Sequence, residues 1–268
     1  MSALAAAGAA LLGGRLAQAR PLGGGDLSEI VAIALADGRT AIVKGSPAPR
    51  TEAAMLRAIA AAGAPAPAVL AASDEALVIA VLPADGGVGT AWGDLGRVLA
   101  RLHATTGDRY GWPEDYAFGP VAIVNRVADD WPTFWGERRL LVNVPHVPAA
   151  LARRIEALAA DLANRLPARP PASLLHGDLW GGNVLVAGDR VSGLIDPACY
   201  HGHGEVDVAM LGLFARPDRA FFEAYGPLAP GHAERLAIYS LWPALVHLRL
   251  FGSGYRTMVE RCLAAAGA

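Results

Sequence analysis

Two turns with polar side chains, set between short apolar runs, constrain the fold of this 268-residue chain more than any other feature. The first turn, in the segment His-Gly-Asp-Leu-Trp-Gly-Gly-Asn, carries Asp178 and Asn183, and the second carries Asp196. Apolar runs at residues 184–186 and 191–195 fit two short strands joined by a turn. A strand pair of this kind would bring the three side chains together on a rigid scaffold.

The three side chains match the requirements of phosphoryl transfer from ATP. That reaction needs a carboxylate that orients the acceptor hydroxyl and oxygen ligands that hold Mg²⁺ on the phosphates. Asp178 and Asn183 reproduce the catalytic-loop spacing of kinases, in which the Asp serves the acceptor and the Asn serves a metal ion. Asp196 follows where a second metal-binding Asp belongs. Each residue alone is a common turn or cap residue, but together and in this order they predict an ATP- and Mg²⁺-dependent phosphotransferase.

The amino-terminal part supplies matching groups for the nucleotide. Lys44 ends a predicted strand and Glu52 opens the following helix. A lysine on an apolar strand is unusual unless it is paired, so we expect an ion pair that holds Lys44 against the α- and β-phosphates. Gly24 and Gly25 precede a strand, where glycine would let backbone amides approach the phosphates. The glycine run at residues 23–25 matches neither GxGxxG nor GxxxxGK(S/T), the two common phosphate-binding motifs. A simple hairpin turn is therefore an equally good interpretation of this run.

The first part of the chain is predicted to be a strand-rich lobe with one key helix. Apolar alternation and turn residues indicate its elements, which are strands at residues 29–35, 40–44 and 76–82, a turn at 37–38, and a helix at 51–62 capped by Thr51. A short apolar helix comes before these elements, and residues 21–26 fit a turn. Residues 83–87 contain Pro and two Gly residues and fit a linker.

The remainder of the chain is mainly helical in pattern. Apolar spacing predicts helices at 95–103 and 149–166 and several more within 207–263, whereas 110–147 is irregular and rich in aromatic residues. The whole pattern predicts an α+β, bilobal, protein-kinase-like fold. Its small N-lobe would cover residues 1–82 and its larger, mainly helical C-lobe residues 83–268. We expect ATP between the lobes, with its adenine against the linker.

Composition excludes several other classes of protein. The hydrophobic fraction of 53% and the charged fraction of 18% allow a substantial core and argue against disorder. The formal net charge is -2 and no run of Lys or Arg exceeds two residues, so we expect no nucleic-acid partner. No segment reaches the ~18 uninterrupted apolar residues of a membrane span.

Cysteine usage and the amino terminus indicate the compartment. Cys199 and Cys262 are the two cysteines, and neither lies in a CxxC motif. A disulfide framework is therefore unsupported, and a reducing, cytoplasmic setting is expected. The apolar stretch at residues 2–12 has no positive charge before it, so a helix fits it better than a secretory signal. We expect a monomer.

The sequence resembles the fructosamine kinase (ketosamine-3-kinase) family, within the kinase-like fold that it shares with aminoglycoside phosphotransferases and choline kinases. The resemblance covers nearly the whole chain and rests on longer motifs, namely residues 21–26 (PLGGGD), 43–44 with Glu52, 129–131 with 134–140 (FWGERRL), 176–185 (HGDLWGGNVL) and 195–210 (IDPACYHGHGEVDVAM). The Asp178–Asn183–Asp196 pattern marks the wider superfamily, whereas the residues around it are more particular to the fructosamine kinases.

The resemblance implies a role for each matching residue. Asp178 would be the catalytic base, Asn183 and Asp196 the Mg²⁺ ligands, and Lys44 with Glu52 the phosphate-anchoring pair. Asp207 would brace the catalytic loop from beneath. The implied acceptor is O3 of a ketosamine, formed by glycation of an amine and either free or protein-bound. Asn125 matches a family residue near the acceptor site, although its neighbours differ from the family pattern.

Aromatic and histidine residues give further candidates for the acceptor site. Trp180 directly follows the Asp178 turn and is the best aromatic candidate. His203 is a second candidate, and loop packing is its alternative role. Three residues of the irregular segment have two equal interpretations, since they would either line an acceptor pocket or pack the segment onto the helices. These residues are Trp131, Phe134 and Trp135.

Two alternative functions stay open from the sequence. The first is a kinase of another hydroxylated amine, such as an aminoglycoside or choline, and it predicts an acidic acceptor pocket. The second is a nucleotide-binding pseudokinase that acts as a regulatory partner. The intact set of Lys44, Asp178, Asn183 and Asp196 argues against this second alternative.

Overall fold

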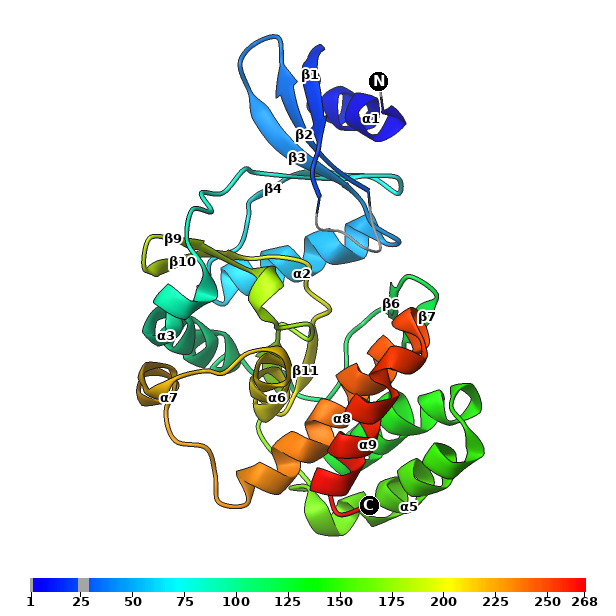
Figure 1. Cartoon of the computed structure of the whole chain (residues 1–268). Coiled ribbons are helices and arrows are strands. Elements are labelled where there is room, and N and C mark those ends of the chain that lie inside the picture. The colour runs from blue at the N-terminus through cyan, green and yellow to red at the C-terminus, as the bar shows by residue number, and fades with distance from the viewer. Residues whose placement is uncertain (1, 24–28) are drawn as a thin grey trace.

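The structure, a computed structural model, describes residues 2–23 and 29–268. Its amino-terminal part is built on a five-stranded antiparallel sheet, which lies at one end of the molecule (Figure 1). The strand order is β1-β2-β3-β5-β4. The strands are β1 (Leu16–Pro21), β2 (Glu29–Leu35), β3 (Thr40–Gly45), β4 (Val69–Ala72) and β5 (Leu77–Ile79). Helix α1 (Ala3–Leu11) precedes the sheet, and helix α2 (Pro49–Ala61) connects β3 to β4.

The two helices cover opposite faces of this sheet. Successive side chains of a strand point to opposite faces. On β3, Val43 packs in the cluster that contains Ala5 and Ala9 of α1, whereas Ile42 packs against the cluster that contains Leu56 of α2. Strand β3 is therefore packed on both faces, whereas β2 buries alternate residues in the cluster that contains α1.

Several predicted elements of this part differ from the structure in detail. Strands β2 and β3 lie where they were predicted, but β5 is shorter than residues 76–82, and β1 and β4 were not predicted. The predicted cap at Thr51 is wrong, because α2 begins at Pro49 after Ala48. Proline favours the first position of a helix. The Thr51 hydroxyl instead donates to Glu114 Oε2 at 2.7 Å.

The second part of the chain is mainly helical, as predicted. Its longer helices are α3 (Trp92–His103), α5 (Ala149–Arg165), α6 (Glu205–Phe214), α7 (Arg219–Tyr225), α8 (His232–Phe251) and α9 (Arg256–Ala265). This part also contains three two-stranded antiparallel sheets. They pair β6 (Tyr116–Phe118) with β7 (Val121–Ile123), β8 (Ser173–Leu175) with β11 (Tyr200–Gly202), and β9 (Val184–Ala187) with β10 (Arg190–Leu194). The predicted bilobal α+β fold is confirmed. We propose the boundary between the lobes after residue 82.

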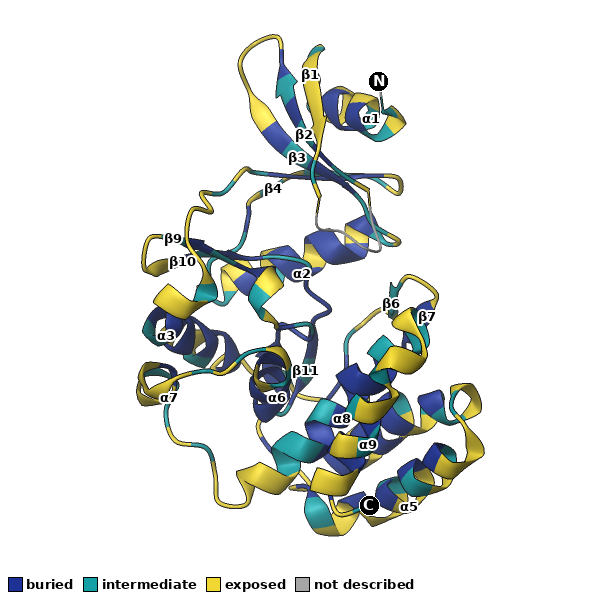
Figure 2. Ribbon diagram, viewed as in Figure 1, coloured by how far each residue is buried: buried dark blue, intermediate teal, exposed yellow. Residues whose placement is uncertain are grey.

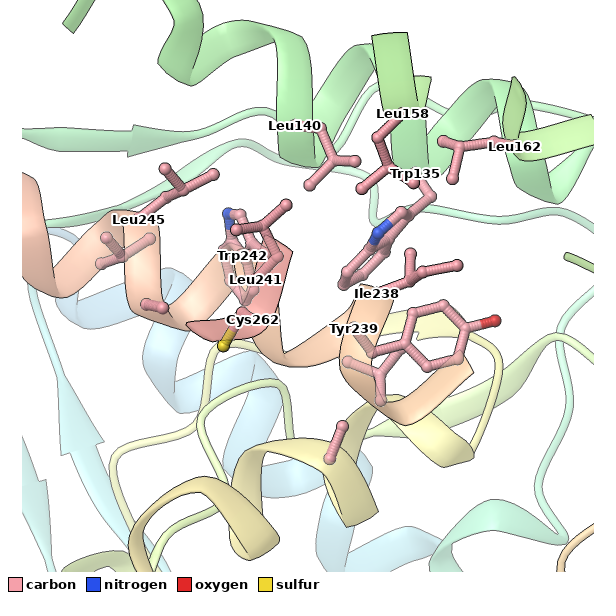
Figure 3. Close-up of a cluster of buried hydrophobic side chains, with 14 of the residues drawn as sticks. Trp135, Leu140, Leu158, Leu162, Ile238, Tyr239, Leu241, Trp242, Leu245 and Cys262 are labelled. Carbon is pink, nitrogen blue, oxygen red and sulfur yellow. The ribbon is translucent and has the colours of Figure 1, made fainter. Parts of the chain in front are cut away.

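The irregular segment at 110–147 contributes a buried aromatic core to the helical lobe. Helix α4 (Trp131–Trp135) continues into a π-helical turn (Gly136–Leu140) and a 3-10 turn (Leu141–His146). Trp135 and Leu140 pack against α5 and α8 (Figure 3). Trp131, Phe134 and Trp135 are all 0% exposed, so they pack the segment onto the helices and do not line an acceptor pocket. Burial is densest where the helices meet, and their outer faces are exposed (Figure 2).

Candidate active site

The loop between β8 and β9 carries Asp178 and Asn183 on consecutive turns. Asn183 ends a short 3-10 helix (Gly181–Asn183). Its Nδ2 donates to the backbone oxygen of Asp178 at 2.8 Å and to Asp178 Oδ2 at 3.1 Å. These bonds fix the Asn183 amide and leave its Oδ1 as the atom that could coordinate a metal ion.

A buried carboxylate holds this loop from below. Asp207, in the first turn of α6, is 0% exposed and accepts hydrogen bonds from the amides of His176 at 2.7 Å and Gly177 at 2.9 Å. His103 Nε2 lies 3.1 Å from Asp207 Oδ2. Burial alone would raise the pKa of Asp207, but His103, His176 and the Gly177 amide outweigh it and lower the pKa. This is the bracing position that the family resemblance implies for Asp207.

The surroundings of the Asp178 carboxyl raise its pKa. Its pKa is raised to about 7, mainly by burial and also by the nearby charges of Asp196 and Asp207, while the hydrogen bond from Asn183 opposes this shift. A general base is most effective when its pKa lies near the operating pH. Asp178 is therefore suited to accept a proton near neutral pH.

Asp196 follows β10 and connects the two lobes. Its φ of 55° makes it the non-glycine residue with a left-handed backbone among those the structure describes, and such strained positions cluster at functional sites. Its Oδ1 is paired with Lys44 Nζ, which also lies 2.5 Å from Glu52 Oε1. Burial alone would lower the pKa of Lys44, but the two carboxylates outweigh it and raise the pKa.

All five of these groups meet in one cavity of about 450 Å³. Lys44, Glu52, Asp178, Asn183 and Asp196 lie among its lining residues. Trp180 lines it too, with 42% of its surface exposed. The site residues Gly24 and Gly25 predicted from the sequence lie outside the described residues.

Two predicted acceptor contacts lie elsewhere. Asn125 is 0% exposed; its Oδ1 accepts from Arg139 at 2.8 Å and its Nδ2 donates to the Glu114 backbone at 3.1 Å. His203 Nδ1 lies 2.9 Å from the Tyr239 hydroxyl. Neither residue is among those that line the cavity, so their positions do not support a direct contact with the acceptor.

The oxygen atoms at the site fit a magnesium ion that is shared with phosphates. Mg²⁺ prefers hard oxygen ligands and usually takes only one or two from the protein, the rest coming from phosphates and water. Asn183 Oδ1 and the Asp196 carboxylate, which is 34% exposed, are ligands of this kind. In the described ranges no group of three or more His, Cys, Asp or Glu side chains is arranged to hold a metal ion by itself.

The sequence did not indicate the apolar wall of the cavity. This wall comes from β6, from the end of α6 and from one face of α8, and includes Phe118, Phe214, Trp242, Val246, His247 and Phe251. The wall residues on α8 recur every four positions. A helix packed on the core shows the same pattern, so the spacing does not distinguish a cavity wall from core packing. The signal that could have found them is the excess of large aromatic residues at the ends of these helices.

Solved structures of known phosphotransferases share this fold. An aminoglycoside phosphotransferase in complex with an ATP analogue and hygromycin B has a TM-score of 0.65 at 18% identity, covering 94% of this chain and 92% of that one. A macrolide 2'-phosphotransferase from Brachybacterium faecium has a TM-score of 0.61 at 20% identity, covering 96% and 95%. The chain therefore has the kinase-like fold of these phosphotransferases.

Closer similarity identifies the family. A family model described as fructosamine kinase matches residues 11–266. A crystal structure of a candidate fructosamine-3-kinase from Thermobifida fusca has a TM-score of 0.89 at 31% identity and covers 98% of both chains. The chain belongs to the fructosamine kinase family, as its sequence motifs predicted.

Curated relatives carry related names. A probable ketoamine kinase from Thermus thermophilus is 35% identical over 264 residues, which cover 92% of this chain and 94% of that protein. One from Synechocystis is 36% identical over 201 residues, covering 70% of this chain, and a protein-ribulosamine 3-kinase from Arabidopsis thaliana is 34% identical over 177 residues, covering 61%. The matched region spans 66% of the Synechocystis protein and 53% of the Arabidopsis protein, less than two thirds of each.

Within the part of the chain that the structure describes, every helix is too short or too polar to cross a bilayer.

Proposed function

We propose that this protein transfers the γ-phosphoryl group of ATP to a sugar hydroxyl, O3, of a ketosamine. The observation that carries this proposal is the meeting of Asp178, Asn183, Asp196 and the Lys44–Glu52 pair in one cavity of a fructosamine kinase family chain. ATP as the donor is supported by two proteins of the same fold, an amicoumacin kinase and an aminoglycoside phosphotransferase, whose structures contain AMP-PNP.

The side chains divide the work of phosphoryl transfer. Asp178 accepts or orients the proton of the acceptor hydroxyl, a contribution of ~10² to 10⁴ in rate for a positioned base. Asn183 keeps the Asp178 carboxylate oriented through Nδ2. Lys44, held by Glu52, faces the α- and β-phosphates. Asn183 and Asp196 would hold Mg²⁺, and this ion would supply positive charge that neutralises the transferred group.

We place the adenine against the linker at 83–87 and the acceptor in the cavity. The linker residues are not among those lining the cavity, whereas Asp178 and Trp180 are. The nucleotide would therefore reach the Asp178 end from the linker side, and the acceptor sugar would lie between Asp178 and Trp180. We further infer a monomer and a cytoplasmic location, the latter in keeping with the two buried, unpaired cysteines.

The lining of the cavity disfavours polycationic acceptors. Its acidic residues within the described ranges are Glu52, Asp178 and Asp196, all at the catalytic end, and two of them are paired with Lys44. An aminoglycoside kinase would need further carboxylates along the acceptor side. A pseudokinase is disfavoured because the four groups that phosphoryl transfer requires all line the cavity.

A panel of acceptors tests this proposal. ATP consumption would be measured with fructosyl-lysine, ribulosyl-lysine, kanamycin and choline in parallel, with Asp178→Asn as the blank. We expect turnover of at least one ketosamine, and a loss of ~10²-fold or more in Asp178→Asn. Turnover of kanamycin or choline alone would refute the ketosamine assignment, and ATP binding without turnover of any acceptor would favour the pseudokinase.

A further inference from the structure

The outer half of the cavity is an aromatic rim that phosphoryl transfer itself does not require. The rim consists of Phe214 at the end of α6, His247 and Phe251 on α8, and Tyr255 in the 3-10 turn Ser253–Tyr255. The His247 ring lies 4.8 Å from Phe214, 5.5 Å from Phe251 and 5.1 Å from Tyr255, between ring centroids. The end of α6, α8 and the 3-10 turn thus place their aromatic rings around one opening.

The rim exposes apolar surface to solvent. Phe214 is 37% exposed and Phe251 is 44% exposed. Deeper in the same cavity lie Val246, one turn before Leu250 on α8, and Trp242, two turns before it. An exposed apolar surface that continues into a cavity commonly marks a binding site. Because this surface and Asp178 line the same cavity, a substituent of a sugar held at Asp178 would extend along it.

The charge around the rim selects against cations. No Asp or Glu in the described ranges lines this outer half. The guanidinium of Arg139 lies behind Trp242, 4.9 Å from the ring centroid, and is 0% exposed. Aromatic rings can bind quaternary ammonium groups, but here the Trp242 ring already stacks on a buried cation.

We propose that the aromatic rim binds the amine substituent of the ketosamine and selects ketosamines of apolar amines over those of small or polycationic amines. This inference rests on the proposed function, because the sugar must lie at Asp178 for the substituent to reach the rim. Its occupant is an aliphatic chain or aromatic ring attached to the ketosamine nitrogen.

A series of fructosyl amines tests the selection. The fructosyl derivatives of methylamine, butylamine, benzylamine and putrescine would be compared by kcat/KM with the intact protein. Each buried methylene contributes ~0.8 kcal/mol, so we expect the butylamine and benzylamine adducts to exceed the methylamine adduct by about ten- to a hundredfold. The putrescine adduct has the same four-carbon chain with a terminal ammonium and should fall below the butylamine adduct.

Two matched variants localise the effect to the rim. In Phe251→Ala we expect the ratio of kcat/KM for benzylamine and methylamine adducts to fall about tenfold, mainly through KM, because such binding is equal in ground and transition states. Phe222→Ala is the control, since Phe222 is 38% exposed on α7 and does not line the cavity. In Phe222→Ala, the ratio of kcat/KM for the benzylamine and methylamine adducts should equal that of the unsubstituted protein.

The outcomes separate this inference from the proposed function. Equal kcat/KM across the series, a preference for the putrescine adduct, or an equal loss in both variants would overturn the role of the rim while leaving the ketosamine activity intact. Absence of turnover with every ketosamine would instead refute the proposed function and the inference with it.

Discussion

Among single residues, Lys44 stands out because it is 5% exposed and is paired with two carboxylates. In Lys44→Met, the side-chain partner left to Glu52 among the described residues would be the Tyr116 hydroxyl, at 3.4 Å. Leaving one member of a buried pair uncompensated costs about 3 kcal/mol. We expect a loss of this size in urea unfolding, together with a large rise in the KM for ATP.

A second substitution separates stability from nucleotide binding. Adding Glu52→Gln to Lys44→Met removes the unpaired charge, so we expect part of the unfolding free energy to return while the KM for ATP stays high. If Lys44→Met were as stable as the unsubstituted protein, the buried pair would have no role in folding. An unchanged KM for ATP would contradict the contact with phosphates.

His203 gives the protein a sensitivity to acid. Burial lowers the pKa of His203 to about 4, although Glu205 opposes the shift. The unfolded chain takes up this proton below about pH 6.5 and the folded protein only near pH 4. Protonation therefore favours unfolding as pH falls through this window, by up to about 3 kcal/mol. We predict that His203→Gln flattens the dependence of the unfolding free energy on pH between 7 and 4.

The control for this prediction is His146→Gln, at an exposed position in the 3-10 turn Leu141–His146. It should leave the pH dependence unchanged. Equal slopes in His203→Gln and in the unsubstituted protein would show that other buried groups, such as Asp207, account for the loss of stability in acid.

At the scale of elements, the catalytic loop is placed by a close approach of two backbones. Gly177 has φ of 80°, and a Cβ atom there would lie 2.0 Å from the backbone oxygen of Ala198. Gly188, in the turn between β9 and β10, has φ of 62° but nothing within 4 Å. Substituting either by Ala strains the backbone by roughly 1 to 2 kcal/mol, but only Gly177→Ala must also move the loop.

We therefore expect Gly188→Ala to lower the melting temperature slightly and to keep its kcat. Gly177→Ala should lose at least tenfold in kcat, because displacing catalytic groups by about 1 Å costs up to ~10²-fold in rate. Circular dichroism melting and ATP turnover measure both effects. Similar kcat values in the two variants would show that the loop tolerates displacement.

The elements that sequence could predict are those with strong local signals. Strands β2 and β3 show apolar runs around an Asp-Gly turn, and the loop of Asp178 carries a motif of fixed spacing. Strand β1 is the counterexample, since five of its six residues are exposed and its place depends on pairing with β2. Local pattern does not report such pairing.

The candidate site was predictable in its polar half and unpredictable in its apolar half. Lys44 and Asp196 are 152 residues apart, yet the order of the motifs predicted that both serve the phosphates, and the two side chains are paired in the structure. Asn125 was expected near the acceptor site, but its side chain accepts a hydrogen bond from the buried Arg139 instead. The aromatic residues of the rim are spread over three elements, so only tertiary packing brings them together.

At the scale of the whole molecule, the β9–β10 hairpin ties the two lobes. The Leu194 amide donates to Pro65 of the N-lobe at 2.8 Å, and the amides of Asp85 and Gly86 in the linker donate to the Val186 oxygen at 3.1 and 2.9 Å. The same hairpin leads directly into Asp196, which pairs with Lys44 of the N-lobe sheet. A nucleotide bound between the lobes would therefore stabilise both of them together.

This coupling predicts how the nucleotide and Mg²⁺ change thermal unfolding. At about 100 times its Kd, AMP-PNP with Mg²⁺ should add ~2.7 kcal/mol, a rise of roughly 5 to 10 °C in a single transition. Chelation of Mg²⁺ should remove most of the rise, and in Asp196→Asn the metal should make little difference. Asp189→Asn, at an exposed position of the same hairpin, is the control and should respond like the unsubstituted protein. A ligand that bridges the lobes cannot stabilise one without the other. Two separate transitions, of which only one shifts, would therefore contradict this coupling and show that the lobes unfold independently.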